Sequence, residues 1–396
     1  MNDLSARLLA QGLELNRRFT RAAANGVDWV FKRDTLIKSG RTWFELVHDS
    51  DLMAVRYYAL PDDDEIDLPD GTQMPIRRRR HAVPLVLVPP LGVTTDVFDL
   101  MPQRSLVKYL VASGFKVYVV DWGRPKKEHG HLGLQDYACD MLGNALKKVR
   151  EHAGSPELSL MGWCMGGLFC LLYQGESKDP LVRNIVTVAS PIDLESGSGV
   201  IAGVAGVAHA LDGPARLVSR YSDLFLDALD PALLSAPPWL TTLVFKMTDP
   251  LASVTTYWDL MAKLYDREFL EAHSTTSDYL NHMLMYPGGV LRDVAVKVVG
   301  GNQLARGCVE FGDTAADLDA IRCNFLGFAG EGDKLVPGEV ARCIVDIVAS
   351  RDKDFRMAPG GHMGVIIGSS ACDAVWAQTV EWLASRSAAA RKRVRR

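Results

Sequence analysis

The sequence lacks a long apolar run. Its longest weakly polar stretch, residues 197–211, is shorter than the roughly 20 residues that a helix needs to span a bilayer, and it contains His209. The first 22 residues carry Asp3 and no apolar segment of roughly 7–15 residues of the kind that precedes a cleavage site in a secretion signal. We therefore expect a cytoplasmic protein with neither an export signal nor a transmembrane segment.

Paired cysteines and an excess of positive charge are also missing. The seven cysteines are an odd number and lie scattered at positions 139, 164, 170, 308, 323, 343 and 372. This scatter excludes a disulfide framework and a paired zinc motif, and it favours a reducing compartment. The net charge of −4 offers no basic surface for nucleic acid, so no nucleic-acid partner is expected.

Motifs for nucleotides and metals are absent too. We find no Walker loop, no H-E-x-x-H and no C-x-x-C, and the sequence therefore predicts neither a cofactor nor a metal. What the chain does have is a globular composition, with 48 % apolar and 23 % charged residues. Disorder over most of the chain is excluded by that balance. The 396 residues fit two to three domains, or one large α/β domain with an insertion.

Residues 1–81 form a predicted N-terminal extension. Apolar residues recur at helical spacing within residues 4–31, with arginines between them. Two interpretations stay open for this helix: it packs on its own domain, or it is an arm that docks on a partner or a surface. Two short strands are expected next, over residues 42–47 and 52–58.

From residue 83 onward, short runs of Val, Ile, Leu and Phe alternate with helical stretches. Continuous apolar strands are typical of a parallel sheet that helices cover on both faces. Helices are expected at 102–114, 134–152, 165–176, 338–350 and 371–385. The alternation predicts a doubly wound α/β fold with a mostly parallel sheet, over a catalytic domain of residues 82–385.

The alternation breaks over about residues 191–309. This stretch carries Pro-Pro at 237–238, aromatic helix fragments and a Gly-rich run at 197–206. A long insertion after a strand in mid-sheet is typical of a cap or lid, and we expect it to open and close over the site. Residues 386–396 form a basic tail.

The strongest motif is Gly162-Trp163-Cys164-Met165-Gly166-Gly167, which follows an apolar strand and opens an apolar helix. This pattern predicts the nucleophile elbow of an α/β-hydrolase, with Cys164 where serine is usual. The positive end of the helix that follows favours a thiolate. The alternative is a buried structural cysteine in a Gly-rich turn.

An elbow nucleophile needs an acid and a base later in the chain, in that order. Asp333 follows one predicted strand and His362 follows the next, and no other histidine lies beyond residue 282. The oxyanion hole needs two backbone N–H groups. Met165 supplies one, and Leu91 or Gly92 the other, because Pro89 and Pro90 have no N–H.

With these residues in place, the chain resembles the poly(3-hydroxyalkanoate) synthases, and among them the short class III catalytic subunits. The resemblance spans about residues 84–385 and is weakest in the predicted cap. It is carried by the cysteine elbow and by residues 84–90, 105–110, 120–125, 190–193, 333, 335–337 and 360–364.

The resemblance implies an α/β-hydrolase fold and an acyltransferase that polymerises 3-hydroxyacyl-CoA with release of CoA. Cys164 would carry the growing polyester chain as a thioester, and His362 would deprotonate it. Asp333 would help to activate the 3-hydroxyl group. CoA enters as part of the substrate and not as a cofactor, and the protein would act at the surface of polyester granules.

One residue departs from the family pattern, because Lys334 follows Asp333 where histidine is common. Three interpretations stay open: a synthase, a thioesterase or polyester hydrolase with the same triad, and a non-catalytic granule-associated protein. The acyl chain length stays open as well, as does the choice between a homodimer and a second synthase subunit.

Overall fold

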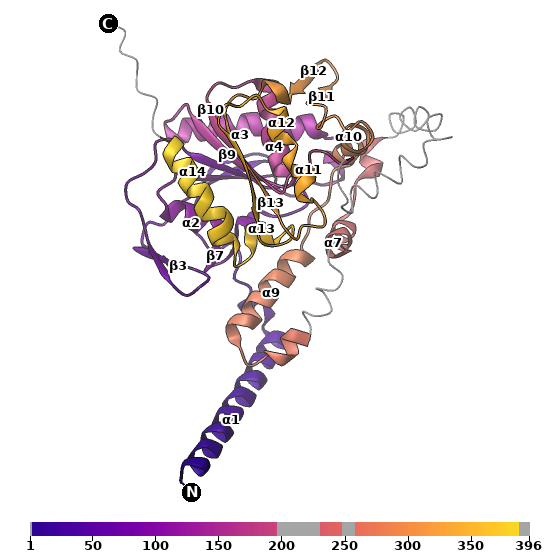
Figure 1. The fold of residues 1–396 in the computed structure, drawn as a ribbon. Helices are drawn as coiled ribbons and strands as arrows, with labels where there is room; N and C mark the ends of the chain where they lie inside the picture. Colours follow the sequence, from indigo (N-terminus) through magenta and orange to yellow (C-terminus); the bar gives the residue numbers. More distant parts are fainter. Residues whose placement is uncertain (1, 196–229, 248–257, 388–396) are drawn as a thin grey trace.

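An eight-stranded sheet forms the centre of the protein (Figure 1). The computed structural model describes residues 2–195, 230–247 and 258–387. The strand order is β1-β2-β8-β5-β9-β10-β13-β14, and the last six strands in this order are parallel. The strands are β1 (Phe44–Asp49), β2 (Ala54–Tyr58), β5 (Leu85–Val88), β8 (Val117–Asp121), β9 (Leu158–Trp163), β10 (Val182–Val188), β13 (Asn324–Gly330) and β14 (Lys353–Ala358).

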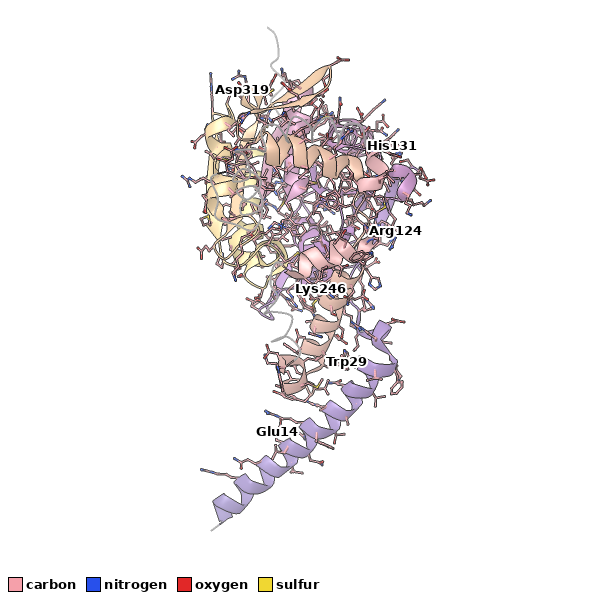
Figure 2. The ribbon with its side chains drawn as sticks, turned by 90° about the vertical axis from the view of Figure 1, so that its right-hand side faces the viewer. Glu14, Trp29, Arg124, His131, Lys246 and Asp319 are labelled. Atoms are coloured by element: carbon pink, nitrogen blue, oxygen red, sulfur yellow. The ribbon has the colours of Figure 1, made fainter. Side chains whose placement is uncertain are left out.

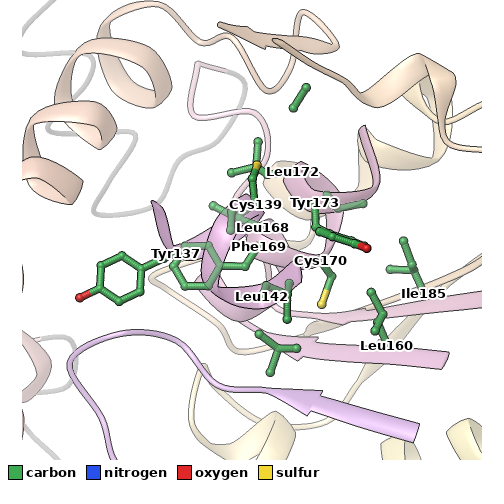
Figure 3. Packing of buried hydrophobic residues seen from close by; sticks show 14 of the residues in the cluster. Tyr137, Cys139, Leu142, Leu160, Leu168, Phe169, Cys170, Leu172, Tyr173 and Ile185 are labelled. Atoms are coloured by element: carbon green, nitrogen blue, oxygen red, sulfur yellow. The ribbon is translucent and has the colours of Figure 1, made fainter. Parts of the chain in front are cut away.

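Two apolar layers, one on each face of the sheet, hold the helices in place. Strands β5 and β9 are buried at every position, as expected for strands covered on both faces. One layer packs α3 (Leu142–Ala153), α4 (Met165–Ser177), α11 (Gly338–Arg342) and α12 (Ile344–Ile347). Figure 3 shows part of it, where Leu168 and Phe169 of α4 lie near Leu160 of β9. The other layer packs α2 (Leu106–Ala112), α13 (Gly364–Ile367) and α14 (Gln378–Arg386).

The strand pair expected in the N-terminal extension is confirmed as β1 and β2, which pair antiparallel. These strands do not form a separate unit. Strand β2 pairs antiparallel with β8, from Ala54 opposite Asp121 to Tyr58 opposite Val117. The central sheet therefore includes residues that precede position 82.

Helix α1 (Asn2–Phe31) extends away from the body of the molecule, with Glu14 on its projecting part (Figure 2). The expectation that it packs along its own domain is wrong for most of its length, since Phe19 is 76 % exposed and Leu13 is 58 % exposed. Arg18, near the middle of the helix, lies over the ring of Tyr265 at 4.8 Å, and two polar contacts hold the last turns. Asn25 donates a hydrogen bond to the carbonyl of Leu264 at 2.8 Å, and Asp28 pairs with Arg267 of α9 (Arg267–Asn281) at 2.6 Å.

The parts of the predicted cap that the structure describes are helical. They comprise η5 (Pro231–Leu234), α7 (Pro238–Met247), α9, α10 (Gly288–Asp293) and the π-helix η6 (Val294–Gly300). The Gly-rich run at 197–206 lies outside the described residues, and the opening and closing of this segment stays a prediction. Among the described helices, none is both long and apolar enough to cross a bilayer.

Short elements complete the fold, and the sequence predicted few of them. Three small antiparallel pairs are β3 (Glu65–Asp67) with β4 (Gln73–Pro75), β6 (Asp99–Met101) with β7 (Arg104–Ser105), and β11 (Cys308–Phe311) with β12 (Thr314–Asp317). Single turns of helix are η1 (Arg33–Leu36), η2 (Thr95–Phe98), η3 (Lys127–His129) and η7 (Leu318–Ala320), and π-helical turns are η4 (Asp136–Met141) and η8 (Cys372–Ala377).

Candidate active site

The predicted site residues meet at one edge of the sheet. Leu91 follows β5, Cys164 follows β9, and Asp333 follows β13, while His362 follows β14. All four strands are parallel, so the loops at their carboxyl ends lie along the same edge, which is where α/β folds place their sites.

The turn at Cys164 has a strained backbone. Strand β9 ends at Trp163 and α4 begins at Met165, so the chain reverses within one residue. Cys164 adopts φ 53° and ψ −123°, a backbone conformation that residues other than glycine rarely adopt. Two hydrogen bonds hold it there, from its own N–H to the carbonyl of Val188 at 2.8 Å and from the hydroxyl of Ser190 to its carbonyl at 2.9 Å.

The glycines around Cys164 allow close backbone contacts that a side chain would block. A Cβ on Gly162 would lie 2.3 Å from the carbonyl carbon of Gly166, and one on Gly166 would lie 2.0 Å from the carbonyl oxygen of Val88. A Cβ on Gly167 would lie 2.0 Å from the hydroxyl of Ser190. The strand, the turn and the helix can therefore pack this closely only with glycine at these positions.

Replacing one of these glycines is expected to destabilise the protein strongly. Gly166→Ala pushes a methyl group into the backbone of β5, which cannot move aside, and we expect a loss of about 3 kcal/mol or more in unfolding free energy. The matched control is Gly12→Ala, where no atom lies within 4 Å and the site is an exposed helix interior; there we expect a gain of up to about 1 kcal/mol. Thermal unfolding measures both, and equal midpoints for the two variants would contradict this account of the turn.

The carboxylate of Asp333 holds His362 in one orientation. Asp333 Oδ2 lies 2.8 Å from His362 Nδ1, and Asp333 Oδ1 accepts the backbone N–H groups of Leu335 at 2.9 Å and Val336 at 2.8 Å. Both side chains are buried, with 5 % of Asp333 and 7 % of His362 exposed. His362 Nε2, on the other side of the ring, has no hydrogen-bond partner of regular geometry within the described chain. This nitrogen is therefore available to exchange a proton with a substrate or with a neighbouring group.

The electrostatics of this pair favour a charged imidazole. Burial is the largest single influence and lowers the pKa of His362, but the Cys164 thiolate and the Asp333 carboxylate together outweigh it and raise that pKa to about 10. The imidazole of His362 is therefore charged at neutral pH. Burial raises the pKa of the other cysteines, Cys139, Cys170, Cys308, Cys323, Cys343 and Cys372, which keeps them as thiols.

The two predicted oxyanion donors have free N–H groups. Among the described residues, neither Met165 nor Leu91 donates its backbone N–H to another group of the protein. Trp122 anchors the loop before Leu91 by donating its indole N–H to the carbonyl of Pro89 at 2.8 Å. Leu284 anchors the other end by donating to the carbonyl of Gly92 at 2.8 Å. The oxyanion assignment stays a prediction, and this anchoring supports it.

The Asp121-Trp122-Gly123 motif supports the site without forming part of it. Asp121 accepts the N–H of Gly123 at 2.9 Å and forms an ion pair with Arg56 of β2. Gly123 has φ +63°, and a Cβ there would lie 2.4 Å from the carbonyl oxygen of Leu52. The motif therefore shapes the turn after β8 and directs Trp122 toward the loop before Leu91.

Lys334, the residue that departs from the sequence pattern of the resembling family, lies on the surface. Lys334 is exposed, whereas its neighbour Asp333 is buried against His362. The lysine therefore does not enter the contact between Asp333 and His362. Nor does the described chain contain a group of three or more His, Cys, Asp or Glu side chains placed to hold a metal ion.

The sequence did not indicate one further residue at the site, Tyr286. Its hydroxyl donates to Met165 Sδ at 2.8 Å, beside the nucleophile. Tyr286 lies in the segment between α9 and α10, where the sequence carries neither a strand pattern nor a catalytic motif, so no local signal marks it.

The chain is similar to several known proteins. The chain is 26 % identical over 389 residues to the poly(3-hydroxyalkanoate) polymerase subunit PhaC of Haloferax mediterranei, covering 97 % of this chain and 71 % of that one. It is 26 % identical to the subunit of the same name from Allochromatium vinosum, covering 81 % of this chain and 84 % of the relative. Among solved structures, it is similar to a monoacylglycerol lipase from Paleococcus ferrophilus, with a TM-score of 0.42 at 18 % identity over 79 % of this chain and all of the lipase.

The family model for the alpha/beta hydrolase fold matches residues 83–369, which is more than half of the chain. The match covers the parallel strands, the elbow at Cys164 and the loops that carry Asp333 and His362. It confirms the fold class that the strand and helix alternation predicted. The chain belongs to the alpha/beta hydrolase fold family.

Proposed function

We propose that this protein is a poly(3-hydroxyalkanoate) synthase, an acyltransferase that polymerises 3-hydroxyacyl-CoA through an acyl group on Cys164. One observation carries the proposal: a cysteine occupies the elbow, paired with a charged histidine, in a chain whose curated relatives bear the name of this polymerase. Because those relatives are named subunits, a companion protein belongs in any test of activity.

The first half-reaction loads the enzyme. The Cys164 thiolate attacks the carbonyl carbon of the acyl-CoA thioester, and the negative charge that develops on the carbonyl oxygen is stabilised by the N–H groups of Met165 and Leu91. The bond from that carbon to the sulfur of CoA then breaks. His362 Nε2 gives its proton to the departing CoA thiolate, which leaves the imidazole neutral. The products are acyl-Cys164 and CoA.

The second half-reaction extends the chain. The 3-hydroxyl of another unit attacks the acyl-Cys164 carbonyl, its proton passes to the neutral His362 Nε2, and the bond to Cys164 Sγ breaks as the new ester forms. The resemblance assigns activation of this hydroxyl to Asp333, but both oxygens of Asp333 are already occupied by backbone N–H groups and by His362. The geometry therefore favours His362 as the base, with Asp333 acting through it.

A cysteine nucleophile suits acyl transfer to an alcohol better than it suits hydrolysis. An acyl-Cys thioester is close in energy to the acyl-CoA thioester, so loading conserves the energy needed to form the next ester. The alcohol must then react in preference to water, which requires a site that excludes water. Burial of His362 and Asp333, at 7 % and 5 % exposed, is consistent with such a site.

The test is the product formed from 3-hydroxybutyryl-CoA by the purified protein, with and without a companion subunit encoded beside it. CoA release matched by insoluble or chain-extended ester supports the synthase. CoA release matched one-for-one by free 3-hydroxybutyrate under every condition would overturn it in favour of a thioesterase. Polymer binding without CoA release would point to a non-catalytic granule protein.

A further inference from the structure

Tyr286 lies between the loop after β5, which carries the proposed donor Leu91, and the side chain of Met165, the other proposed donor. Its ring lies over Gly92, where a Cβ would be 3.1 Å from Cδ2 of the tyrosine, and its hydroxyl donates to Met165 Sδ at 2.8 Å. Gly92 adjoins Leu91, and Met165 adjoins Cys164. The tyrosine therefore contacts the side chain of one proposed donor and the neighbour of the other.

Backbone contacts hold Tyr286 in this place. Its N–H donates to the carbonyl of Ala236 at 2.9 Å, and the N–H of Ala236 donates back to the carbonyl of Tyr286 at 3.0 Å. Two residues earlier, Leu284 donates to the carbonyl of Gly92 at 2.8 Å. The segment is thus fastened both to the loop after β5 and to the turn after η5, which keeps the tyrosine beside the nucleophile.

The hydroxyl of Tyr286 has a weak partner. A thioether sulfur accepts hydrogen bonds poorly, so an oxygen would be a better acceptor at the same place. Burial, then the charges of the Cys164 thiolate and of Tyr137, raise the pKa of Tyr286 well above its usual value. The phenol is therefore protonated at neutral pH and can donate a hydrogen bond.

Tyr137 is a second buried hydroxyl close to this place. Its side chain is fully buried, yet its oxygen has no hydrogen-bond partner among the described residues. Its ring stacks on Phe169 and meets the edge of Trp122, and Figure 3 shows its hydroxyl pointing away from the packed apolar side chains. Tyr137 lies in the π-helix η4, a distortion that is frequent at functional sites.

We propose that Tyr286, with Tyr137 beside it, binds the oxygen on C3 of the acyl group held by Cys164. Such a contact would make the site selective for 3-hydroxyacyl thioesters over thioesters with no oxygen at C3. Only two carbons, C2 and C3, separate this oxygen from the carbonyl carbon that Cys164 attacks, so a hydroxyl that contacts Met165 and lies beside Gly92 is within reach of it. The inference rests on the proposed function, and it names the oxygen on C3 as the feature of the substrate that the site recognises.

The experiment compares two substrates in four proteins, each assayed with and without the companion subunit. The rate of Cys164 acylation is measured as the burst of CoA release from 3-hydroxybutyryl-CoA and from butyryl-CoA, in the wild type, Tyr286→Phe, Tyr137→Phe and Tyr279→Phe. In kcat/KM for acylation, we expect the wild type to prefer the 3-hydroxy substrate by about 10–100-fold. Tyr286→Phe should lose at least about tenfold of that preference, because its rate falls much more for 3-hydroxybutyryl-CoA than for butyryl-CoA, and Tyr137→Phe should lose less.

Tyr279→Phe is the matched control. Tyr279 is also buried with an unpartnered hydroxyl, but the charge that acts on it is that of Asp96 and not that of Cys164. Its removal should leave the preference unchanged, and thermal unfolding verifies that each variant is folded.

Two results would overturn the inference alone: a wild type that acylates Cys164 equally fast with both substrates, or a preference that survives in Tyr286→Phe. Absence of acyl-Cys164 with either thioester would instead overturn the proposed function, and this inference with it.

Discussion

Cys164→Ala is expected to lower acyl transfer by at least about 10⁴-fold while changing the thermal midpoint by no more than a few degrees. The substitution removes the only thiol at the elbow, and no other group in the described site can form the thioester. It keeps the Cβ, so the backbone strain at φ 53° is the same in both proteins. The side chain is only partly buried, so little packing is lost.

The control for this variant is Cys170→Ala, on the same helix. Cys170 is fully buried and burial raises its pKa, so it is a core thiol, and its loss should cost about 1 kcal/mol of stability and leave activity intact. Mass spectrometry of the wild type after mixing with substrate should find the acyl group on the peptide that carries Cys164. An adduct on another cysteine, or an active Cys164→Ala protein, would contradict the assignment.

The features that sequence reasoning predicted well are local ones. The apolar runs of β5 and β9 reveal a sheet covered on both faces, because a parallel strand buried on both sides has no polar positions to break the run. The elbow could also be identified from the sequence, because glycine is required at 162, 166 and 167: a Cβ at any of these positions would lie 2.0–2.3 Å from a neighbouring atom. The order of residues along the chain then pointed to Asp333 and His362, and in the structure Asp333 Oδ2 lies 2.8 Å from His362 Nδ1.

What the sequence did not show depends on contacts between distant segments. Tyr286 lies beside Cys164 only because its segment pairs with Ala236 and donates to Gly92, and no periodic pattern encodes either contact. The apolar positions of α1 predicted a helix correctly, but periodicity alone does not say whether an apolar face is covered, and here Phe19 is exposed. The pairing of β2 with β8 joins residues about 60 positions apart, so the strands of the extension could be predicted but not their place in the central sheet.

His362→Gln is expected to slow the first acylation of Cys164 by about 10²–10⁴-fold. In the proposed mechanism the imidazolium stabilises negative charge on Cys164 Sγ and donates the proton that CoA needs to leave, and glutamine does neither. The charge pairing also predicts a pH dependence. Because the pKa of His362 is raised to about 10 in the folded protein, the imidazolium persists through neutral pH, and wild-type alkylation of Cys164 by iodoacetamide should stay fast between pH 7 and 9. In His362→Gln, alkylation over the same range should be slower and should rise with pH, as expected for a cysteine without a cationic partner.

Asp333→Asn separates the two roles that Asp333 could have. If the carboxylate acts through His362, as its bonds to Nδ1 and to the N–H groups of Leu335 and Val336 indicate, the variant should slow acylation and chain growth by similar factors, each smaller than the loss in His362→Gln. An amide can still accept from one backbone N–H but cannot balance the charge on the imidazole, so the pKa of His362 should fall. Rapid quenching with 3-hydroxybutyryl-CoA measures the first acyl-Cys164 separately from later elongation. A normal first burst followed by slow chain growth would show instead that Asp333 acts directly on the 3-hydroxyl, and that the position it occupies here, bound to His362, is not the one from which it works.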